Sequence, residues 1–280
     1  MKVAFADVEG LRTRYLIAGT GPLVVLVHPV GYTADVFIRL IPVLSRAFTV
    51  AAPDLPGQGF SAPKPGPQVP PQRYMADQML SLATLLGFDR FSILGSSLGG
   101  LVAALVALDA PARIDKLVLV GTGSVFNDPA DQPRVLQAVY ANGSTAYLDP
   151  SPDACRVRIG NTCHVKPAAE DLLLLQATAY ALPGALDAYR AIIDGMIDSA
   201  ADVRHTAYPH LERLQMPVLV VLGANDKRTS VEAHRAGTAR IPVASMAVID
   251  DCGHLPYLEH PEQFARILAG FLGPGAAAVN

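Results

Sequence analysis

The sequence of 280 residues has little charge and no long hydrophobic run. Charged residues make up only 17% of the chain, and the formal net charge is −3 with no basic block. The sequence therefore lacks the basic patch that nucleic-acid binding requires. No apolar run reaches the length of a membrane span, and Leu23–Val27 is far too short. We therefore expect neither nucleic acid nor a membrane among the partners of this chain.

Cysteines and cofactor motifs are also scarce. Cys155, Cys163 and Cys252 are too few for a disulfide framework, and Met1–Gly10 lacks the apolar centre of a signal peptide. These two features favour a reducing cytoplasm. Cys155, Cys163 and His164 bring no fourth ligand at zinc-finger spacing, and neither G-x-G-x-x-G nor a P-loop occurs. We therefore expect no metal and no cofactor.

Apolar residues are abundant and follow an alternating pattern. They make up 51% of the chain, enough for a sizeable core. Short aliphatic runs predict strands at Val3–Ala6, Thr13–Ala18, Val24–Val27, Thr49–Ala52, Phe91–Leu94, Leu117–Val120, Val218–Leu222 and Ser245–Ile249, the first two as a hairpin. Helical patterns lie at Asp35–Ser45, Arg73–Leu86, Leu98–Leu108, Val231–Ala239 and Gln263–Phe271. Strands that alternate with helices predict a mainly parallel sheet flanked by helices.

The strand signal disappears from residue 124 to residue 209. Ala169–Leu182 and Leu186–Met196 are predicted helices, separated by Pro183-Gly184. We expect a helical cap at 124–209, inserted into a core domain made of residues 1–123 and 210–280. Two other segments carry no such pattern, and we expect a stiff loop at Pro63–Pro71 and a frayed tail at Gly273–Asn280.

The most informative segment is Gly95-Ser96-Ser97-Leu98-Gly99, which lies between a predicted strand and a predicted helix. A G-x-S-x-G motif in this context indicates a nucleophile elbow, a tight turn that lifts the serine hydroxyl clear of the sheet. Ser97 is the centre of the motif, because Ser96 lacks glycines at the right offsets. The alternative is that Ser97 is an ordinary helix N-cap.

An acid and a base, Asp226 and His254, follow Ser97 along the chain. His254 lies on a loop after the last predicted strand, and Asp226 follows the strand Val218–Leu222. A serine needs a base to become a nucleophile, and a carboxylate orients the imidazole. Asp250 and Asp251 are rivals for the acid, but they lie too near His254 in the sequence to reach its far nitrogen easily.

These motifs resemble the α/β-hydrolase family over nearly the whole chain. Further matching pieces are His28-Pro29-Val30-Gly31, Asp54–Ser61, Gly223–Asp226 and Gly253-His254. The resemblance implies the α/β-hydrolase fold, the triad Ser97, Asp226 and His254, and a cap. The backbone N–H groups of Val30 and Leu98 are the expected oxyanion hole. The family usually has glycine at the position of Pro29, and we expect His28 to have a structural role in that loop.

Serine at the elbow points to acyl transfer, whereas family members that are haloalkane dehalogenases or epoxide hydrolases carry aspartate there. We expect a cofactor-free serine hydrolase that cleaves a carboxylic ester or related small carbonyl substrate. Candidate substrate-binding residues are Leu174, Tyr180, Tyr189, Arg190 and Leu255. The cap cations Arg156, Arg158, Lys166 and Arg190 could hold a carboxylate, although such groups are more often solvated.

Two alternatives stay open. The stretch from Pro183 to Ala191 is somewhat similar to hydrolases of aromatic meta-cleavage products, which cut a C–C bond in a keto acid; those enzymes commonly have tryptophan where this chain has Leu255. A small-molecule receptor built on the same scaffold is the other alternative. The expected partner is a small-molecule substrate, and a homodimer is left open.

Overall fold

A computed structural model describes residues 1–64, 70–165 and 170–273. These residues form one sheet in the order β1-β2-β4-β3-β5-β6-β7-β8. The strands are β1 (Lys2–Val8), β2 (Leu11–Ala18), β3 (Leu23–Val27), β4 (Thr49–Pro53), β5 (Phe91–Ser96), β6 (Ile114–Val120), β7 (Val218–Gly223) and β8 (Ala244–Ile249). The pairs β1–β2 and β2–β4 are antiparallel, and the remaining neighbours are parallel. The predicted N-terminal hairpin and mainly parallel sheet are confirmed.

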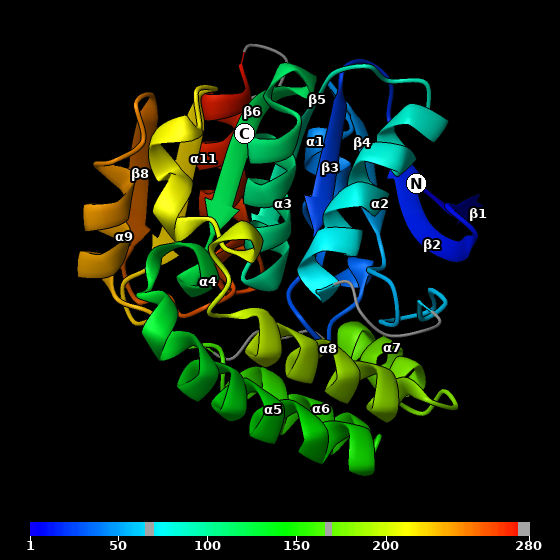
Figure 1. Cartoon of the computed structure of the whole chain (residues 1–280). Coiled ribbons are helices and arrows are strands. Elements are labelled where there is room, and N and C mark those ends of the chain that lie inside the picture. Colours follow the sequence, from blue (N-terminus) through cyan, green and yellow to red (C-terminus); the bar gives the residue numbers. More distant parts are fainter. Residues whose placement is uncertain (65–69, 166–169, 274–280) are drawn as a thin grey trace.

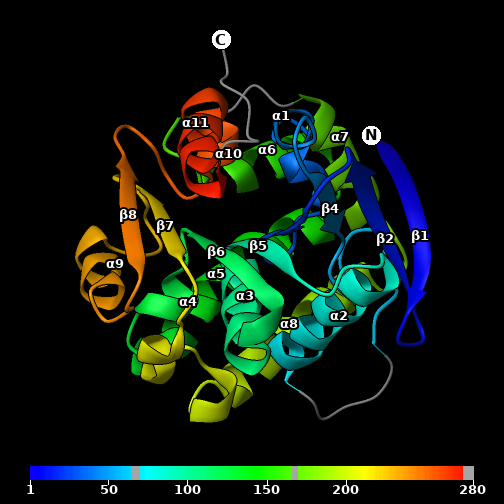
Figure 2. The same ribbon diagram turned by 90° about the horizontal axis from the view of Figure 1, so that it is seen from above.

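Helices cover both faces of this sheet. They are α1 (Ile41–Leu44), α2 (Pro71–Leu85), α3 (Leu98–Asp109), α9 (Val231–Thr238), α10 (Pro256–Glu259) and α11 (Pro261–Leu272). Figure 2 shows α1 and α11 on one face and α2 and α3 on the other. Every residue of β3, β5 and β7 is consequently buried. Strands covered on both faces form continuous apolar runs, which is why these strands were visible in the sequence.

The predicted helix Asp35–Ser45 is wrong as a single element. The structure has a 3-10 turn, η1 (Ala34–Phe37), and then the short helix α1. The Asp35 carboxylate is held by the buried guanidinium of Arg14 at 2.8 Å, which anchors η1 to β2. Pro42 then stands in the first turn of α1, where a proline starts a helix but cannot continue one. The helical pattern of apolar residues is present, but the Arg14–Asp35 ion pair and Pro42 divide the segment into two short elements.

Between β6 and β7, the described residues form helices and no strand. The helices are α4 (Gly123–Phe126), α5 (Gln132–Leu148), α6 (Pro152–Gly160), α7 (Glu170–Tyr180) and α8 (Ala185–Ser199), with 3-10 turns η3 (Pro129–Asp131), η4 (Val203–His205) and η5 (Tyr208–Arg213). Figure 1 shows α5 to α8 as a layer across one end of the sheet, toward which β3 and β6 point. We call α5 to α8 the helical layer. It lies over the carboxyl ends of the strands, where open α/β sheets bind ligands.

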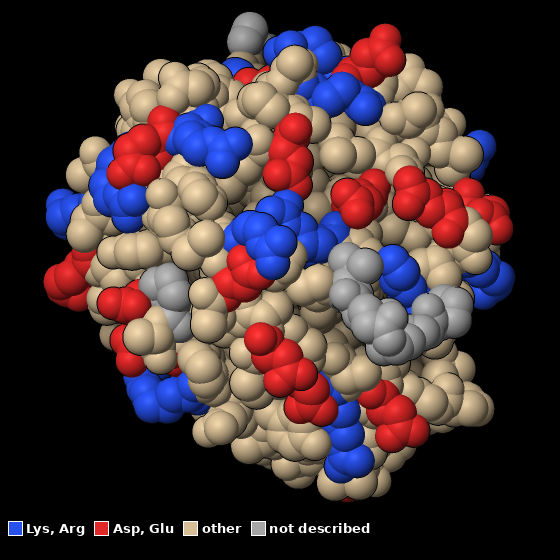
Figure 3. Space-filling view, in the orientation of Figure 1, with Lys and Arg blue, Asp and Glu red and all other residues tan. Residues whose placement is uncertain are grey.

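Two predicted segments lie largely outside the described residues: the proline-rich loop, whose residues 65–69 are not described, and the tail from 274 onward. On the surface drawn in Figure 3, Lys and Arg are interspersed with Asp and Glu. No helix among residues 1–64, 70–165 and 170–273 is long and apolar enough to cross a bilayer.

Candidate active site

Ser97 occupies a strained turn between β5 and α3. Its φ of 54° and ψ of −117° are rare for a residue with a side chain. Its N–H donates to the carbonyl oxygen of Val120 on β6 at 2.9 Å, which holds the turn against the sheet. A side chain at Gly95 would collide with the carbonyl of Gly99, and one at Gly99 would collide with the carbonyl of Val27. The glycines of the motif are therefore required by close backbone contacts.

His254 pairs with Asp226. Its Nδ1 lies 2.7 Å from Asp226 Oδ2, and the two side chains are only 5% and 1% exposed. Because a carboxylate accepts hydrogen bonds and donates none, Nδ1 carries the proton and Nε2 is left as the free, basic nitrogen. The rivals Asp250 and Asp251 are both exposed. The geometry thus pairs His254 with the carboxylate favoured from the sequence.

Ser97 and His254 line two adjoining cavities. The first, called the polar cavity because Asn142, Arg158 and Thr162 reach it, is lined by Pro29, Val30, Tyr32, Ser97, Val139, Asn142, Arg158, Thr162, Arg228 and His254. The second, called the apolar cavity because Val135, Leu136 and Met196 reach it, is lined by Val30, Ser97, Leu98, Gly123, Ser124, Gln132, Val135, Leu136, Val139, Met196, Arg228 and His254. Among the described residues, the Ser97 hydroxyl has no hydrogen-bond partner.

The loop after β3 is fixed so that the Val30 N–H turns away from its anchors. The carbonyl of Pro29 faces His28 Nδ1 at 2.8 Å and accepts from the N–H of Tyr32 at 3.2 Å. In a trans peptide the N–H points opposite to the carbonyl, so these contacts orient the Val30 N–H. His28 Nε2 accepts from the N–H of Leu55 at 2.9 Å, and burial lowers the pKa of His28. The expected structural role of His28 is confirmed, and Pro29 is compatible with the loop.

Two backbone N–H groups are free at the cavity walls. In the described part of the chain, neither Val30 nor Leu98 donates its N–H to another residue. Both residues line the apolar cavity with Ser97. Leu98 is the first residue of α3, so its N–H also lies at the positive end of the helix dipole. These donors suit an oxygen that gains negative charge near Ser97.

Arg158 is a buried cation that sequence reasoning treated as one of several cap cations. It donates to the carbonyls of Gly31 at 2.6 Å and Val30 at 3.1 Å, and also contacts the Tyr180 hydroxyl. Its guanidinium carbon lies 4.8–5.8 Å from the ring centroids of Tyr32, Tyr147, Tyr180 and Tyr189. Arg158 therefore ties α6 of the helical layer to the loop that carries Val30.

Glu259 makes a second tie between the helical layer and the sheet. This buried carboxylate accepts hydrogen bonds from the backbone N–H groups of His164, Val165, Gly253 and Leu255 at 2.7–3.2 Å. Gly253 and Leu255 flank His254, so Glu259 fixes the loop on both sides of the imidazole. Nothing in the local sequence identified this residue, because two of its four partners, His164 and Val165, lie more than 90 residues away in the chain.

The five predicted substrate-binding residues do not line either cavity. Leu174 is 61% exposed, and the prediction that it faces the pocket is wrong. Tyr180 and Tyr189 are buried against the ring of Tyr147, with ring centroids 4.1 and 4.8 Å away. Leu255 is fully buried, and it donates its N–H to the carboxylate described above.

Arg190 is half-buried, with its guanidinium carbon 6.0 Å from the ring centroid of Tyr140. The apolar wall instead comes from Val135, Leu136 and Val139 of α5 and Met196 of α8. α5 was not predicted as an element. The face that a helix turns toward its neighbours depends on packing, which this part of the sequence did not reveal.

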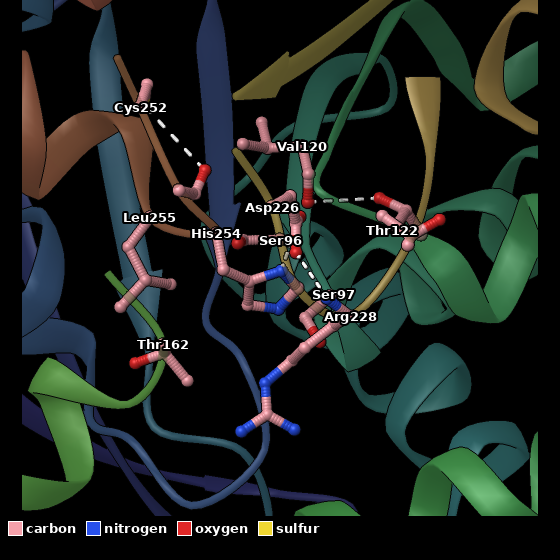
Figure 4. A network of polar contacts seen from close by, with 12 residues as sticks. Ser96, Ser97, Val120, Thr122, Thr162, Asp226, Arg228, Cys252, His254 and Leu255 are labelled. Carbon is pink, nitrogen blue, oxygen red and sulfur yellow. Dashed lines mark hydrogen bonds and ion pairs between the residues drawn. The ribbon is translucent and has the colours of Figure 1, made fainter. Parts of the chain in front are cut away.

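Arg228 is the functional candidate that the sequence analysis missed. It stands two residues after Asp226 and lines both cavities. Its backbone N–H donates to Asp226 Oδ1 at 2.8 Å, which fixes the start of its side chain. Figure 4 shows the side chain passing Ser97, with its guanidinium extended away from the sheet. The sequence feature that could have identified Arg228 is its position two residues after Asp226.

The cysteines are buried and poorly nucleophilic. Burial raises the pKa of Cys155 to about 11 and raises the pKa values of Cys163 and Cys252 further. A thiol with a raised pKa is mostly protonated at neutral pH. In the part of the chain that the structure describes, no group of three or more His, Cys, Asp or Glu residues could hold a metal ion.

Comparison with known proteins identifies the class. Residues 24–267 match the model of the alpha/beta hydrolase family, and the chain belongs to that family. It is 30% identical over 252 residues to a pimeloyl-[acyl-carrier protein] methyl ester esterase of Aromatoleum aromaticum, covering 88% of this chain and 96% of that protein. It is 29% identical over 270 residues to 2-hydroxy-6-oxononadienedioate/2-hydroxy-6-oxononatrienedioate hydrolase 2 of Pseudomonas putida, covering 94% and 88%.

The fold also matches solved structures. That of 2-hydroxy-6-oxo-6-phenylhexa-2,4-dienoate hydrolase from Rhodococcus sp. strain RHA1 superposes with a TM-score of 0.80 at 25% identity, covering 97% of this chain and 99% of that one. A thermophilic esterase from Thermogutta terrifontis gives a TM-score of 0.76 at 25% identity, covering 97% and 98%. Esterases and hydrolases of 2-hydroxy-6-oxo acids therefore both stand among the proteins that this chain resembles.

Proposed function

We propose that this chain is a cofactor-independent serine hydrolase that cleaves a carboxylic ester or a related small carbonyl compound. One observation carries the proposal: Ser97, strained at the head of α3, lines the same cavities as a His254 that is paired with the buried carboxylate of Asp226. A nucleophile, a base and an orienting acid from three separate strand ends are the parts that acyl transfer needs.

In the proposed reaction, Ser97 Oγ attacks the substrate carbonyl carbon while His254 Nε2 takes the hydroxyl proton. Asp226 holds the imidazole and stabilises its protonated form. The tetrahedral intermediate collapses, the bond to the leaving alcohol breaks, and His254 returns the proton to the alcohol oxygen. A water then attacks the acyl-enzyme with His254 again as base. The acid is released and Ser97 is restored.

The N–H groups of Val30 and Leu98 are the proposed oxyanion hole. Neither N–H has a partner among the residues that the structure describes, which supports this role, since both can donate to the oxygen of the intermediate. A preorganised donor of this kind is typically worth about 10²–10³ in turnover. We further propose that 124–209 is a cap over this site, with 1–123 and 210–280 as the core.

A second candidate is hydrolysis of a C–C bond beside a carbonyl in a keto acid. The relative from Pseudomonas putida, a 2-hydroxy-6-oxononadienedioate/2-hydroxy-6-oxononatrienedioate hydrolase, favours it. The same nucleophile and oxyanion donors would serve both reactions. The two differ in whether an oxygen or a carbon leaves, so substrate panels separate them.

The test is pre-steady-state hydrolysis of p-nitrophenyl esters, combined with labelling by a fluorophosphonate. We expect a burst of p-nitrophenol equal to one equivalent of enzyme, and a phosphonate adduct on Ser97. Ser97→Ala should lose both, by many orders of magnitude in turnover. Ser96→Ala is the matched control and should keep the adduct. A folded wild-type protein with neither burst nor adduct would refute the hydrolase and favour a receptor.

A further inference from the structure

The proposed mechanism leaves one charged group of the site unused. Arg228 lines both the polar and the apolar cavity. Among the residues that the structure describes, its guanidinium has no hydrogen-bond or ion-pair partner. Arg14 and Arg158, which are buried, are each held by carboxylates or carbonyls, whereas Arg228 is half-buried. Arg228 therefore differs from them in offering its donors to the cavity.

An unpaired guanidinium in a cavity is costly unless something binds it. Burial is the main influence on Arg228 and lowers its pKa below the usual 12.5, yet a guanidinium stays charged at neutral pH. Partial removal of a charge from water without a partner is unfavourable. The hydrogen bond from its backbone to Asp226 prevents the residue from simply moving away with its loop. The natural partner is an anion that enters with the substrate.

The walls around Arg228 favour negative charge. The polar cavity also contains Arg158, and its neutral polar groups Asn142 and Thr162 are available for hydrogen bonds. No Asp or Glu stands among the described residues that line either cavity. Asp226, the nearest carboxylate in sequence, is already paired with His254. An anionic group of a substrate in the polar cavity would therefore lie near two cationic side chains, Arg158 and Arg228, and near no carboxylate of the cavity lining.

We propose that Arg228 binds a free carboxylate of the substrate, close to the carbonyl that Ser97 attacks. This inference rests on the proposed function and narrows it to half-esters of dicarboxylic acids and related keto acids. A guanidinium and a carboxylate form two parallel hydrogen bonds, which hold the substrate in one orientation. The uncharged part of the substrate then lies along Val135, Leu136 and Met196 in the apolar cavity.

The experiment compares charged and neutral esters of equal length. p-Nitrophenyl hydrogen adipate carries a carboxylate on the acyl side, and p-nitrophenyl hexanoate is its neutral partner. 4-Acetoxybenzoate carries a carboxylate on the alcohol side, and its methyl ester is the neutral partner. The readout is the ratio of kcat/KM for the charged ester to kcat/KM for the neutral ester, because general damage to the site cancels in this ratio.

We expect Arg228→Met to lower this ratio about 10- to 100-fold for at least one pair, mainly through KM. Arg228→Lys keeps the positive charge but not the paired N–H donors of the guanidinium, so it should restore part of the wild-type ratio. Lys227→Met is the matched control, because it removes a cation from the same loop at an exposed position, and it should keep the wild-type ratio. Arg228→Gln is a second variant in case Arg228→Met does not fold.

The outcomes separate the two proposals. Unchanged ratios for both pairs in folded Arg228 variants would overturn the carboxylate site while leaving the hydrolase intact. A loss as large in Lys227→Met would also overturn it, since the effect would then reflect the general charge of the loop. If wild-type protein hydrolyses none of the four esters and takes no phosphonate label, the hydrolase proposal itself fails.

Discussion

Glu259→Gln tests whether a single buried carboxylate holds the loop of His254. Glu259 Oε2 accepts from three N–H groups, those of His164, Val165 and Gly253, at 2.7, 2.8 and 2.9 Å, and Oε1 accepts from Leu255 at 3.2 Å. Glutamine keeps one oxygen for the first three but turns an NH₂ group toward the fourth. We therefore expect three weakened hydrogen bonds and one stranded donor.

The magnitude follows from the difference between charged and neutral hydrogen bonds. Each of the three retained bonds loses about 1 kcal/mol when the acceptor loses its charge, and a stranded N–H costs about 1–3 kcal/mol. Relief of the buried charge offsets part of this sum. We expect Glu259→Gln to lower the free energy of unfolding by about 2–4 kcal/mol, and to reduce kcat with little change in KM, because the imidazole is less firmly placed.

Urea unfolding followed by circular dichroism, together with steady-state hydrolysis of a p-nitrophenyl ester, measures both effects. Glu262→Gln is the control, since Glu262 is exposed at the start of α11 and its neutralisation should cost under about 0.5 kcal/mol. If the two variants are equally stable and equally active, the hydrogen bonds of Glu259 do not support the His254 loop.

Three further changes probe other contacts. Asp226→Asn should keep the fold and lower kcat about 10⁴-fold, because an amide stabilises the wrong imidazole tautomer; near-normal turnover would move the role to Asp250 or Asp251. Arg158→Met should lower kcat about 10- to 100-fold by releasing the Val30 loop, whereas equal kinetics would show that the loop holds itself. Burial lowers the pKa of His234 from 6.5 to about 4, so the unfolded chain takes up the proton first as pH falls. The contribution of neutral His234 to the free energy of unfolding is complete above pH 6.5 and falls by about 3 kcal/mol toward pH 4. The free energy of unfolding of His234→Gln, measured in urea, should lack this part of the pH dependence.

The sequence predicted what depends on neighbours along the chain. Ser97 could be found because its strand, its flanking glycines and its helix are contiguous, and Asp226 and His254 because each follows a recognisable strand. The roles of Arg158 and Glu259 could not be predicted, since some of their hydrogen-bond partners, such as Gly31 and His164, lie more than 90 residues away in the chain. The prediction that Leu174 faces the pocket was wrong for a similar reason: the packing of helices that are distant in sequence decides which face of a helix is buried.

The helical layer contributes to the proposed chemistry as well as to the shape of the pocket. The carbonyl of Thr162 accepts the backbone N–H of His254 at 3.0 Å, so the layer contacts the proposed base directly. Glu259 binds the same layer just beyond Thr162, and Arg158 reaches from it to the carbonyl of Val30. The proposed base and the loop that carries Val30 are thus both positioned by residues outside the sheet. A rearrangement of the helices must therefore change reactivity toward even the smallest ester, whereas a substitution confined to the apolar wall of α5 leaves these three contacts in place and should change substrate preference alone.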